Sequence, residues 1–218
     1  MTPSVSTPIA AHAKTADGQE LPVIDVTHPR FALADDPKAI SALFDAYIEA
    51  ERRQARVPAF VTRWLMRLAA RRAPLLRALL RPNAGFLDGL TTYLMKLGHD
   101  NLPDRCNSDI DRKIAAAPHV IAMRLRLQQC ALLLADCLRA PLQSAHAPLH
   151  LINIGGGTAI DSINALLALH RDSPHLLERP IAILVFDQNP EAPAFGARAI
   201  SALCQPGHPL AGRQIDFQ

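Results

Sequence analysis

Residues 149–161 read LHLINIGGGTAID, and this stretch constrains the fold more than any other part of the 218-residue chain. An apolar run that is typical of a strand enters three consecutive glycines, and an amphipathic helical pattern follows at once. Glycine has no Cβ and adopts positive φ without strain, so Gly155, Gly156 and Gly157 permit a sharp strand-to-helix turn that a ligand can approach closely. The free N–H groups and positive dipole of the helix start point at the same place. The stretch predicts a strand, a ligand-accessible turn and a helix in succession.

The residues after the glycines continue the pattern of a nucleotide-type crossover. Thr158 is the expected N-cap of the helix, with Asp161 in capping-box register, and the helix should end near Arg171. Residues 181–186 form an unbroken apolar run, as expected of a parallel strand covered on both faces. Asp187 follows that strand at its carboxyl end, where open α/β sheets bind ligands. A lone glycine cluster is usually an ordinary turn, but this order of strand, glycines, helix, strand and acid favours a binding site.

The spacing of the glycines separates one kind of ligand from another. A dinucleotide loop of the form G-x-G-x-x-G, begun at Gly155, would place the bulky Ile160 where a third glycine lets the helix pack closely. The pattern acidic-x-G-x-G-x-G instead places Asn153, Gly155, Gly157 and Ala159 at its four positions, and all four are small or polar. On these residues the chain resembles class I S-adenosylmethionine-dependent methyltransferases, and as a whole it looks like bacterial proteins of that class.

The resemblance implies a cofactor, an activity and roles for the site residues. In that family the glycine loop lies against the methionyl and ribose parts of S-adenosyl-L-methionine, and an acid ending the second strand holds the ribose hydroxyls. By resemblance the three glycines take the first role and Asp187 takes the second, with Gln188 and Asn189 beside the adenine. Asn153 stands where the family usually has an acid, so it offers an acceptor but no charge to the cofactor's ammonium. The implied reaction is methyl transfer to an unidentified acceptor, with a small molecule favoured.

Two other classes of function stay open, and no catalytic residue is assigned. The alternatives are a nucleotide- or NAD-binding oxidoreductase and a non-catalytic Rossmann-like binding module. In the methyltransferase family the acceptor-side residue commonly follows a fourth strand, whereas this sequence shows the pattern of only three strands, at 149–154, 181–186 and 214–218. The last strand begins where the sequence stops. We therefore expect the sequence to be the front portion of a longer protein and incomplete for catalysis.

The chain divides into three predicted regions. Residues 1–34 read as a mobile tail followed by an extended arm, because residues 1–20 lack an apolar period. Residues 35–145 form a helical N-terminal region, and residues 146–218 a partial Rossmann-like cofactor-binding domain. The predicted fold class is α/β: a helical N-terminal half followed by the first βαβαβ half of a doubly wound sheet. Helices are expected over about 36–55, 57–80 with a break or kink at Pro74, 86–97, 119–139 and 193–203, with a further segment beginning near 109–111.

Arginine is concentrated in residues 52–81, which hold nine arginines and no acid. Arg63, Arg67 and Arg71 stand at i, i+4 and i+8, so they form one ridge on a helix. A basic amphipathic segment of this kind can lie on RNA or on an anionic membrane surface. A solvated helix face is the commoner outcome and is favoured here.

Composition excludes several classes of protein. A hydrophobic fraction of 49% with 20% charged residues and a net charge of +3 is typical of a soluble globular chain. The four cysteines form no C-x-x-C pair and the nine histidines have no zinc-like spacing, so no metal site is predicted. The N-terminus lacks a secretory signal, and no run approaches eighteen apolar residues. We therefore expect a cytoplasmic protein without a membrane span, whose oligomeric state is not predicted.

Overall fold

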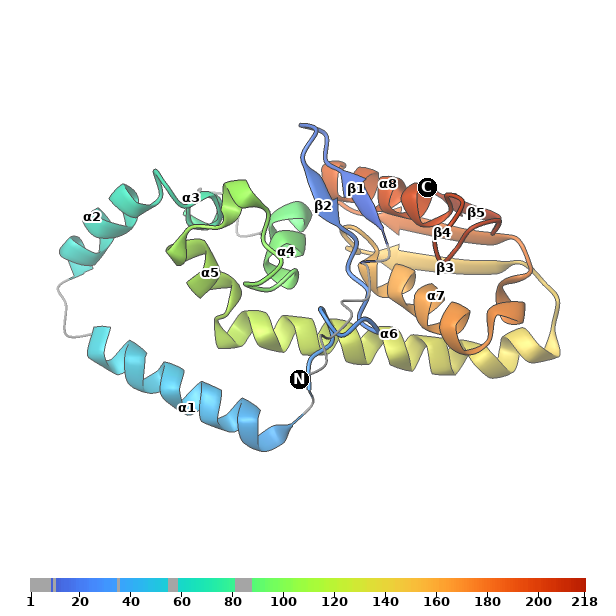
Figure 1. The fold of residues 1–218 in the computed structure, drawn as a ribbon, viewed down its shortest axis with the longest axis horizontal. Helices are drawn as coiled ribbons and strands as arrows, with labels where there is room; N and C mark the ends of the chain where they lie inside the picture. The colour runs from blue at the N-terminus through green and yellow to red at the C-terminus, as the bar shows by residue number, and fades with distance from the viewer. Residues whose placement is uncertain (1–8, 10, 35, 55–58, 81–87) are drawn as a thin grey trace, which may run out of the picture. The chain divides into compact units, whose positions relative to one another are not determined.

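A computed structural model describes residues 9, 11–34, 36–54, 59–80 and 88–218 of the chain (Figure 1). These residues form two compact units. The first combines Met1–Ala32 with Leu127–Gln218, and the second is Leu33–Arg126. The first unit is therefore built from both ends of the sequence, and it contains the glycine-rich stretch.

The first unit contains a three-stranded parallel sheet whose strands follow one another in the order β3-β4-β5. These strands are Leu149–Ile154, Ile181–Phe186 and Ile215–Phe217, and the paired residues run from Leu149 opposite Ile181 to Ile154 opposite Phe186. Helix α7 (Ile160–Asp172) with the 3₁₀ turn η2 (Pro174–Leu177) connects β3 to β4, and α8 (Glu191–Leu203) connects β4 to β5. The α/β class, the three strands and the two intervening helices are confirmed.

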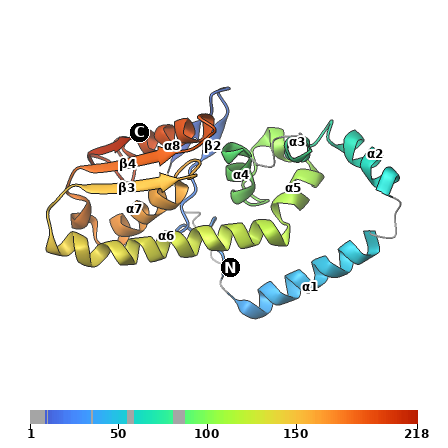
Figure 2. The same ribbon diagram turned by 180° about the vertical axis from the view of Figure 1, so that it is seen from behind.

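Both crossover helices cover the same face of this sheet. Ser162 of α7 bonds to Asn153 of β3, and Gly196 of α8 lies against Phe217 of β5. Leu151, Ile183 and Phe217 are paired across the three strands, so their side chains point to the same face of the sheet. Asn153 lies two residues after Leu151 and therefore points to that face as well. Figure 2, from behind, shows β3 and β4 in front with α7 and α8 beyond them.

The opposite face of the sheet is open. Ile152, Ile154 and Phe186 are 65%, 87% and 61% exposed, whereas Leu151 and Ile183 on the covered face are buried. The prediction that residues 181–186 are covered on both faces is therefore wrong within the described structure. The reason is that both helices pack against one side, while the apolar composition of the strand is the same on both sides.

The N-terminal segment is ordered where a mobile tail was predicted. Strands β1 (His12–Lys14) and β2 (Glu20–Pro22) pair in antiparallel fashion, with Ala13 opposite Leu21. The turn is closed by a hydrogen bond from Thr15 N to Gln19 O of 2.8 Å, and Gly18 supplies a positive φ of 80°. The tail prediction is wrong for residues 12–20, and its first eight residues lie outside the described part of the chain.

The arm after this hairpin lies on α7. Asn164 is fully buried, and its Oδ1 accepts a hydrogen bond from Val26 N at 2.7 Å. Its Nδ2 donates to the carbonyl oxygens of Ile24 and Ile160 at 3.0 and 2.9 Å. One side chain thus fastens an N-terminal segment to the helix that follows the glycines.

The second unit is helical. Pro74 begins a helix at its first turn, where its missing N–H costs nothing, so the predicted break is confirmed. Asp111 is fully buried and accepts a hydrogen bond from Leu75 N at 2.9 Å, which joins α5 to α3. No helix among the described residues is long and apolar enough to cross a bilayer. The helices are α1 (Pro37–Gln54), α2 (Ala59–Ala69), α3 (Pro74–Leu79), α4 (Gly89–Lys96), η1 (Asp104–Cys106), α5 (Asp109–Ala115) and α6 (Pro118–Ser144), the last of which continues into the first unit.

Candidate functional site

The carboxyl ends of β3 and β4 meet at one edge of the sheet. The strands are in register to their last residues, and Gly155 N donates to Phe186 O at 2.7 Å, immediately beyond the ladder. The glycine loop and Asp187 therefore leave the sheet side by side. This is the arrangement that the sequence pattern predicts for a binding site at the strand ends.

The glycine loop has a left-handed backbone at every second residue. The φ angles of Gly155, Gly157 and Ala159 are 63°, 55° and 51°. Gly156 is required for a different reason, since a Cβ there would lie 2.5 Å from the Cβ of Asn153. A Cβ on Gly155 would meet no atom within 4 Å, so this glycine faces open space. The loop is thus bare backbone on its open side and tightly packed beneath.

Asp187 is hydrogen-bonded to the glycine loop. One carboxylate oxygen accepts from Gly157 N at 2.8 Å, and the other accepts from Asn189 N at 2.9 Å. Asn189 Oδ1 in turn accepts from Glu191 N at 2.9 Å, at the start of α8. The acid therefore holds the loop and closes the next turn, and each of its oxygens has a further lone pair for a ligand. Gln188, between the two, is exposed.

Asn153 lies beneath the loop. Its Oδ1 accepts a hydrogen bond from Ser162 Oγ at 3.0 Å, and its Nδ2 is buried without a partner among the described residues. The Nδ2 group is a hydrogen-bond donor, whereas the resemblance assigns Asn153 the role of an acceptor. A buried donor without a partner costs about 1–3 kcal/mol, so a ligand that accepted a hydrogen bond from Nδ2 would remove this cost.

The prediction that Thr158 caps the following helix is wrong. The N-cap is Ala159, which has no side-chain hydrogen bond, and Thr158 is buried one residue earlier. The cause is the third left-handed residue, because Ala159 prolongs the loop by one position and its N–H bonds to Gly156 O at 2.9 Å. Asp161 lies in the first turn of α7, but the capping box with Thr158 is absent. The first amides of α7 thus have no capping side chain.

Gly196 supports the loop and was not singled out from the sequence. A Cβ at this position of α8 would overlap the carbonyl oxygen of Thr158 and lie 2.7 Å from Phe217 Cζ. The absence of a side chain lets α8 approach the glycine loop and β5 together. The available signal was an isolated glycine inside a helical apolar pattern, which usually marks close packing.

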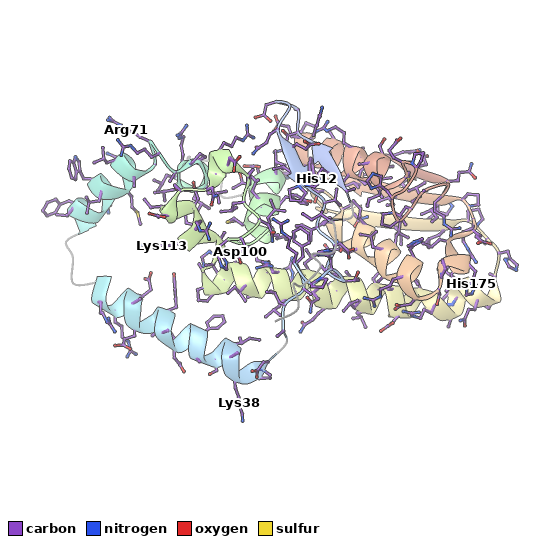
Figure 3. The ribbon with its side chains drawn as sticks, viewed as in Figure 1. His12, Lys38, Arg71, Asp100, Lys113 and His175 are labelled. Atoms are coloured by element: carbon purple, nitrogen blue, oxygen red, sulfur yellow. The ribbon has the colours of Figure 1, made fainter. Side chains whose placement is uncertain are left out.

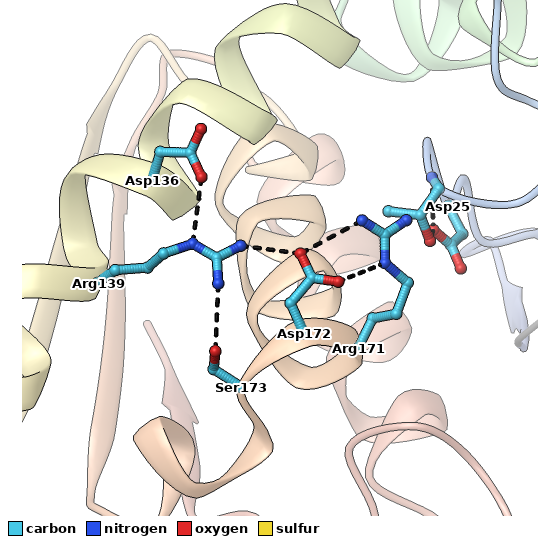
Figure 4. A network of polar contacts seen from close by, with 7 residues as sticks. Asp25, Asp136, Arg139, Arg171, Asp172 and Ser173 are labelled. Atoms are coloured by element: carbon cyan, nitrogen blue, oxygen red, sulfur yellow. Dashed lines mark hydrogen bonds and ion pairs between the residues drawn. The ribbon is translucent and has the colours of Figure 1, made fainter.

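The far end of α7 is anchored by an ion-pair network (Figure 4). Asp172 accepts hydrogen bonds from Arg171 Nε and Arg139 Nη2, both at 2.8 Å. These bonds lower the pKa of Asp172 from 3.8 to about 2. Arg139 of α6 also contacts Asp136 at 3.1 Å and Ser173 Oγ at 3.2 Å, so the network fixes α7 to α6.

The other polar clusters of the first unit lie away from the glycine loop. A cavity of about 350 Å³, lined by residues that include Arg179, Arg213 and Gln214, lies at the amino ends of β4 and β5. Arg179 donates to Leu142 O at 2.7 Å and thereby closes the end of α6. Within the described chain no group of three His, Cys, Asp or Glu residues is placed to hold a metal, and all four cysteines are free thiols.

Comparison with known proteins found no family model, no curated protein and no solved structure that matches this chain.

Proposed function

We propose that the glycine loop and Asp187 bind S-adenosylmethionine and that the protein belongs to a methyl-transfer system. The observation that carries the proposal is the backbone of the loop. Positive φ recurs at Gly155, Gly157 and Ala159, which are the three small positions of the x-G-x-G-x-G pattern. Ala159 adopts the conformation of a third glycine, although it is not one.

The residues of the site fit this cofactor on three further grounds. Gly155 faces open space, so a flat or flexible ligand has room against the backbone. Asp187 stays within hydrogen-bond reach of the loop and has lone pairs left for two hydroxyls of a ribose. The N-cap of α7 has no side-chain hydrogen bond, and a helix N-terminus favours a negatively charged group such as the carboxylate of the ligand.

The chemistry requires little of the protein beyond orientation. Bound S-adenosylmethionine supplies an activated methyl group on a sulfonium. The loop, Asp187 and Gln188 would hold the ligand in one orientation, and proximity to an acceptor accounts for the larger part of such catalysis. No residue of the described site is assigned as the base.

The dinucleotide alternative is disfavoured by the start of α7. Ile160 occupies the third position of a G-x-G-x-x-G loop, and it is 2% exposed in the first helical turn. A glycine there would permit closer approach of the helix to the strand. A non-catalytic binding module stays the second candidate, because both oxygens of Asp187 already accept backbone hydrogen bonds.

A panel of ligands tests the proposal directly. S-adenosylmethionine, S-adenosylhomocysteine, NAD and ATP are added to the chain, and the melting temperature of each mixture is measured. A ligand at 100 times its dissociation constant stabilises by about 2.7 kcal/mol, or roughly 5–10 °C for a chain of this size. Stabilisation by NAD alone would refute the methyltransferase proposal, and no stabilisation by any ligand would favour the binding module.

Two variants with a matched control locate the ligand. Gly155→Val should abolish binding, because the side chain enters the open space over the loop. Gly207→Val is the control: Gly207 also has positive φ, at 86°, and also meets no atom within 4 Å of an added Cβ. Both variants place a β-branched residue at positive φ, but only Gly155→Val fills the space over the loop. Unchanged ligand binding in Gly155→Val would therefore exclude a ligand against the loop.

Asp187→Ala tests the ribose contact. The loss of charge-assisted hydrogen bonds worth about 1.5–3 kcal/mol should weaken binding roughly ten-fold to a hundred-fold in a calorimetric titration. The melting temperature of the free protein should fall as well, since the carboxylate holds Gly157 N. A lower melting temperature with unchanged affinity would mean that Asp187 only stabilises the loop.

A further inference from the structure

Helix α2 presents large apolar side chains to solvent. Phe60 and Trp64 are 75% and 64% exposed, and Leu65 and Leu68 are 49% and 48% exposed. Phe60, Trp64 and Leu68 stand at i, i+4 and i+8, so they share one side of the helix, and Leu65 is their neighbour. We call these four side chains the α2 apolar face. Exposed aromatic and aliphatic groups in one contiguous patch mark an interaction site.

Arginines flank this face without acidic partners. Arg63 and Arg67 are exposed on α2, and Arg71 and Arg72 follow its last turn (Figure 3 labels Arg71). The sequence has no acidic residue from 52 to 87, and no ion pair of these four arginines occurs within the described residues. The surface therefore combines uncompensated positive charge with an apolar face.

The end of α2 is fixed by a further arginine. Arg77 of α3 donates to Ala70 O at 3.0 Å through Nε and to Arg71 O at 2.9 Å through Nη2. Both carbonyl groups lie in the turn that follows the last residue of α2, Ala69, so Arg77 links that turn to α3. The side chains of Arg63, Arg67, Arg71 and Arg72, by contrast, are exposed.

We propose that α2 is an interfacial helix that binds an anionic lipid bilayer surface. The α2 apolar face would lie at the boundary between headgroups and acyl chains, where tryptophan and phenylalanine side chains are favoured. Arg63, Arg67, Arg71 and Arg72 would contact the lipid phosphates around it. The proposal is independent of methyl transfer, since it uses no residue of the glycine loop.

A nucleic acid would use only half of this surface. Arginines bind phosphate backbones equally well, and Trp64 could stack on a base, but the aliphatic Leu65 and Leu68 would stay in water. A bilayer accounts for the basic and the apolar residues together. Helix α1 shows the contrast, because it carries Asp45 and Glu49 among its exposed residues, which an anionic surface would repel.

Trp64 is the single tryptophan of the chain, so its fluorescence reports on α2 alone. The full chain is mixed with vesicles of phosphatidylcholine, or of phosphatidylcholine with phosphatidylglycerol, and its emission and co-sedimentation are recorded. We expect a blue shift and co-sedimentation only with the anionic vesicles, weakening as salt is added. Acyl chains brominated near the headgroup should quench the emission. An unchanged spectrum and no co-sedimentation with anionic vesicles would overturn the proposal.

Substitutions separate the apolar from the electrostatic contribution. Leu68→Glu should abolish vesicle binding, whereas Leu133→Glu should not, although Leu133 of α6 is 65% exposed. Arg63→Gln with Arg67→Gln should lower the partition coefficient by about thirty-fold, at roughly five-fold per arginine. The matched pair Arg30→Gln with Arg126→Gln, two exposed arginines outside α2, should leave it unchanged. Equal effects in test and control variants would refute a site on α2.

Two further outcomes would assign the surface to another partner. Binding to single-stranded RNA that needs Arg63 and Arg67 but not Leu68, without binding to vesicles, would replace the bilayer by nucleic acid. A blue shift of Trp64 that grows with protein concentration in the absence of lipid, together with a dimer in sedimentation, would replace it by a second copy of the chain.

Discussion

Gly196→Ala is predicted to destabilise the first unit, although the same change in an unobstructed helix stabilises. Gly196 lies within α8, where alanine is favoured over glycine by about 1 kcal/mol. The added methyl group, however, would overlap the backbone carbonyl of Thr158 and lie 2.7 Å from Phe217 Cζ. A backbone oxygen cannot move by changing a rotamer, so the loop would have to shift, whereas the Phe217 ring could turn aside.

The two effects have opposite signs, which makes the outcome decisive. Overpacking of a tight interior contact costs about 1–3 kcal/mol, and we expect a cost of about 3 kcal/mol for Gly196→Ala because the obstacle is rigid backbone. Alanine is favoured over glycine in a helix by about 1 kcal/mol, so the free energy of unfolding should fall by about 2 kcal/mol. For a chain of this size the melting temperature should fall by roughly 4–8 °C.

Circular dichroism during heating measures this change, and two further variants control it. Ser201→Ala lies on the exposed side of the same helix and should raise the melting temperature slightly through helix preference alone. Phe217→Leu combined with Gly196→Ala should recover part of the loss, because it removes one of the two obstacles. A rise in melting temperature for Gly196→Ala, like that of Ser201→Ala, would show that α8 does not pack closely on the glycine loop.

Three other predictions concern α7. Asp172→Asn should lower the free energy of unfolding by about 0.5–1 kcal/mol at pH 7, since the partly exposed carboxylate loses two arginine partners. Because the folded-state pKa of Asp172 is lowered from 3.8 to about 2, the difference between wild type and variant in urea titrations should persist above pH 4 and vanish as the pH falls through about 2. Burial, and to a smaller extent the charge of Arg213, lower the pKa of His170 below 6.5 in the folded protein. As the pH falls below 6.5, the imidazole is therefore protonated more readily in the unfolded chain than in the folded one, which favours unfolding. Lowering the pH below 6.5 should thus destabilise the wild type more than His170→Gln. Ala159 has a φ of 51°, which strains a residue with a Cβ, so Ala159→Gly should raise the free energy of unfolding by up to about 1 kcal/mol and raise the melting temperature. A lower melting temperature would mean that packing of the Ala159 methyl group compensates the strain.

The strands and helices of the first unit could be predicted from the sequence because their signals are local. Residues 181–186 form a strand whatever covers them, since an unbroken apolar run between polar turns is sufficient. Which faces become covered is a different matter, because Ile183 and Leu184 are equally apolar while Ile183 alone is fully buried. That difference depends on the side taken by the two helices, which no short stretch encodes.

The hairpin and the helix start could not be predicted for other physical reasons. The buried positions of the N-terminal hairpin include Ala11, Ala13 and Thr15, whose small side chains produce no apolar period. At the glycine loop, capping preferences favour Thr158 over Ala159, but the left-handed turn required by the loop overrides them. Tertiary contacts thus decided the features that local propensity left open.

The fastening of the N-terminal arm by Asn164 has a consequence for the order of events during synthesis. Val26 and Asn164 are separated by 138 positions in the chain. A ribosome that adds about 5–20 residues per second needs roughly 7–28 seconds to cover that interval. During this time the arm has left the ribosome, but the helix that receives it has not yet been made. The helical unit between them is synthesised before α7, so the arm, although made before that unit, reaches its contacts with α7 only after the unit is complete.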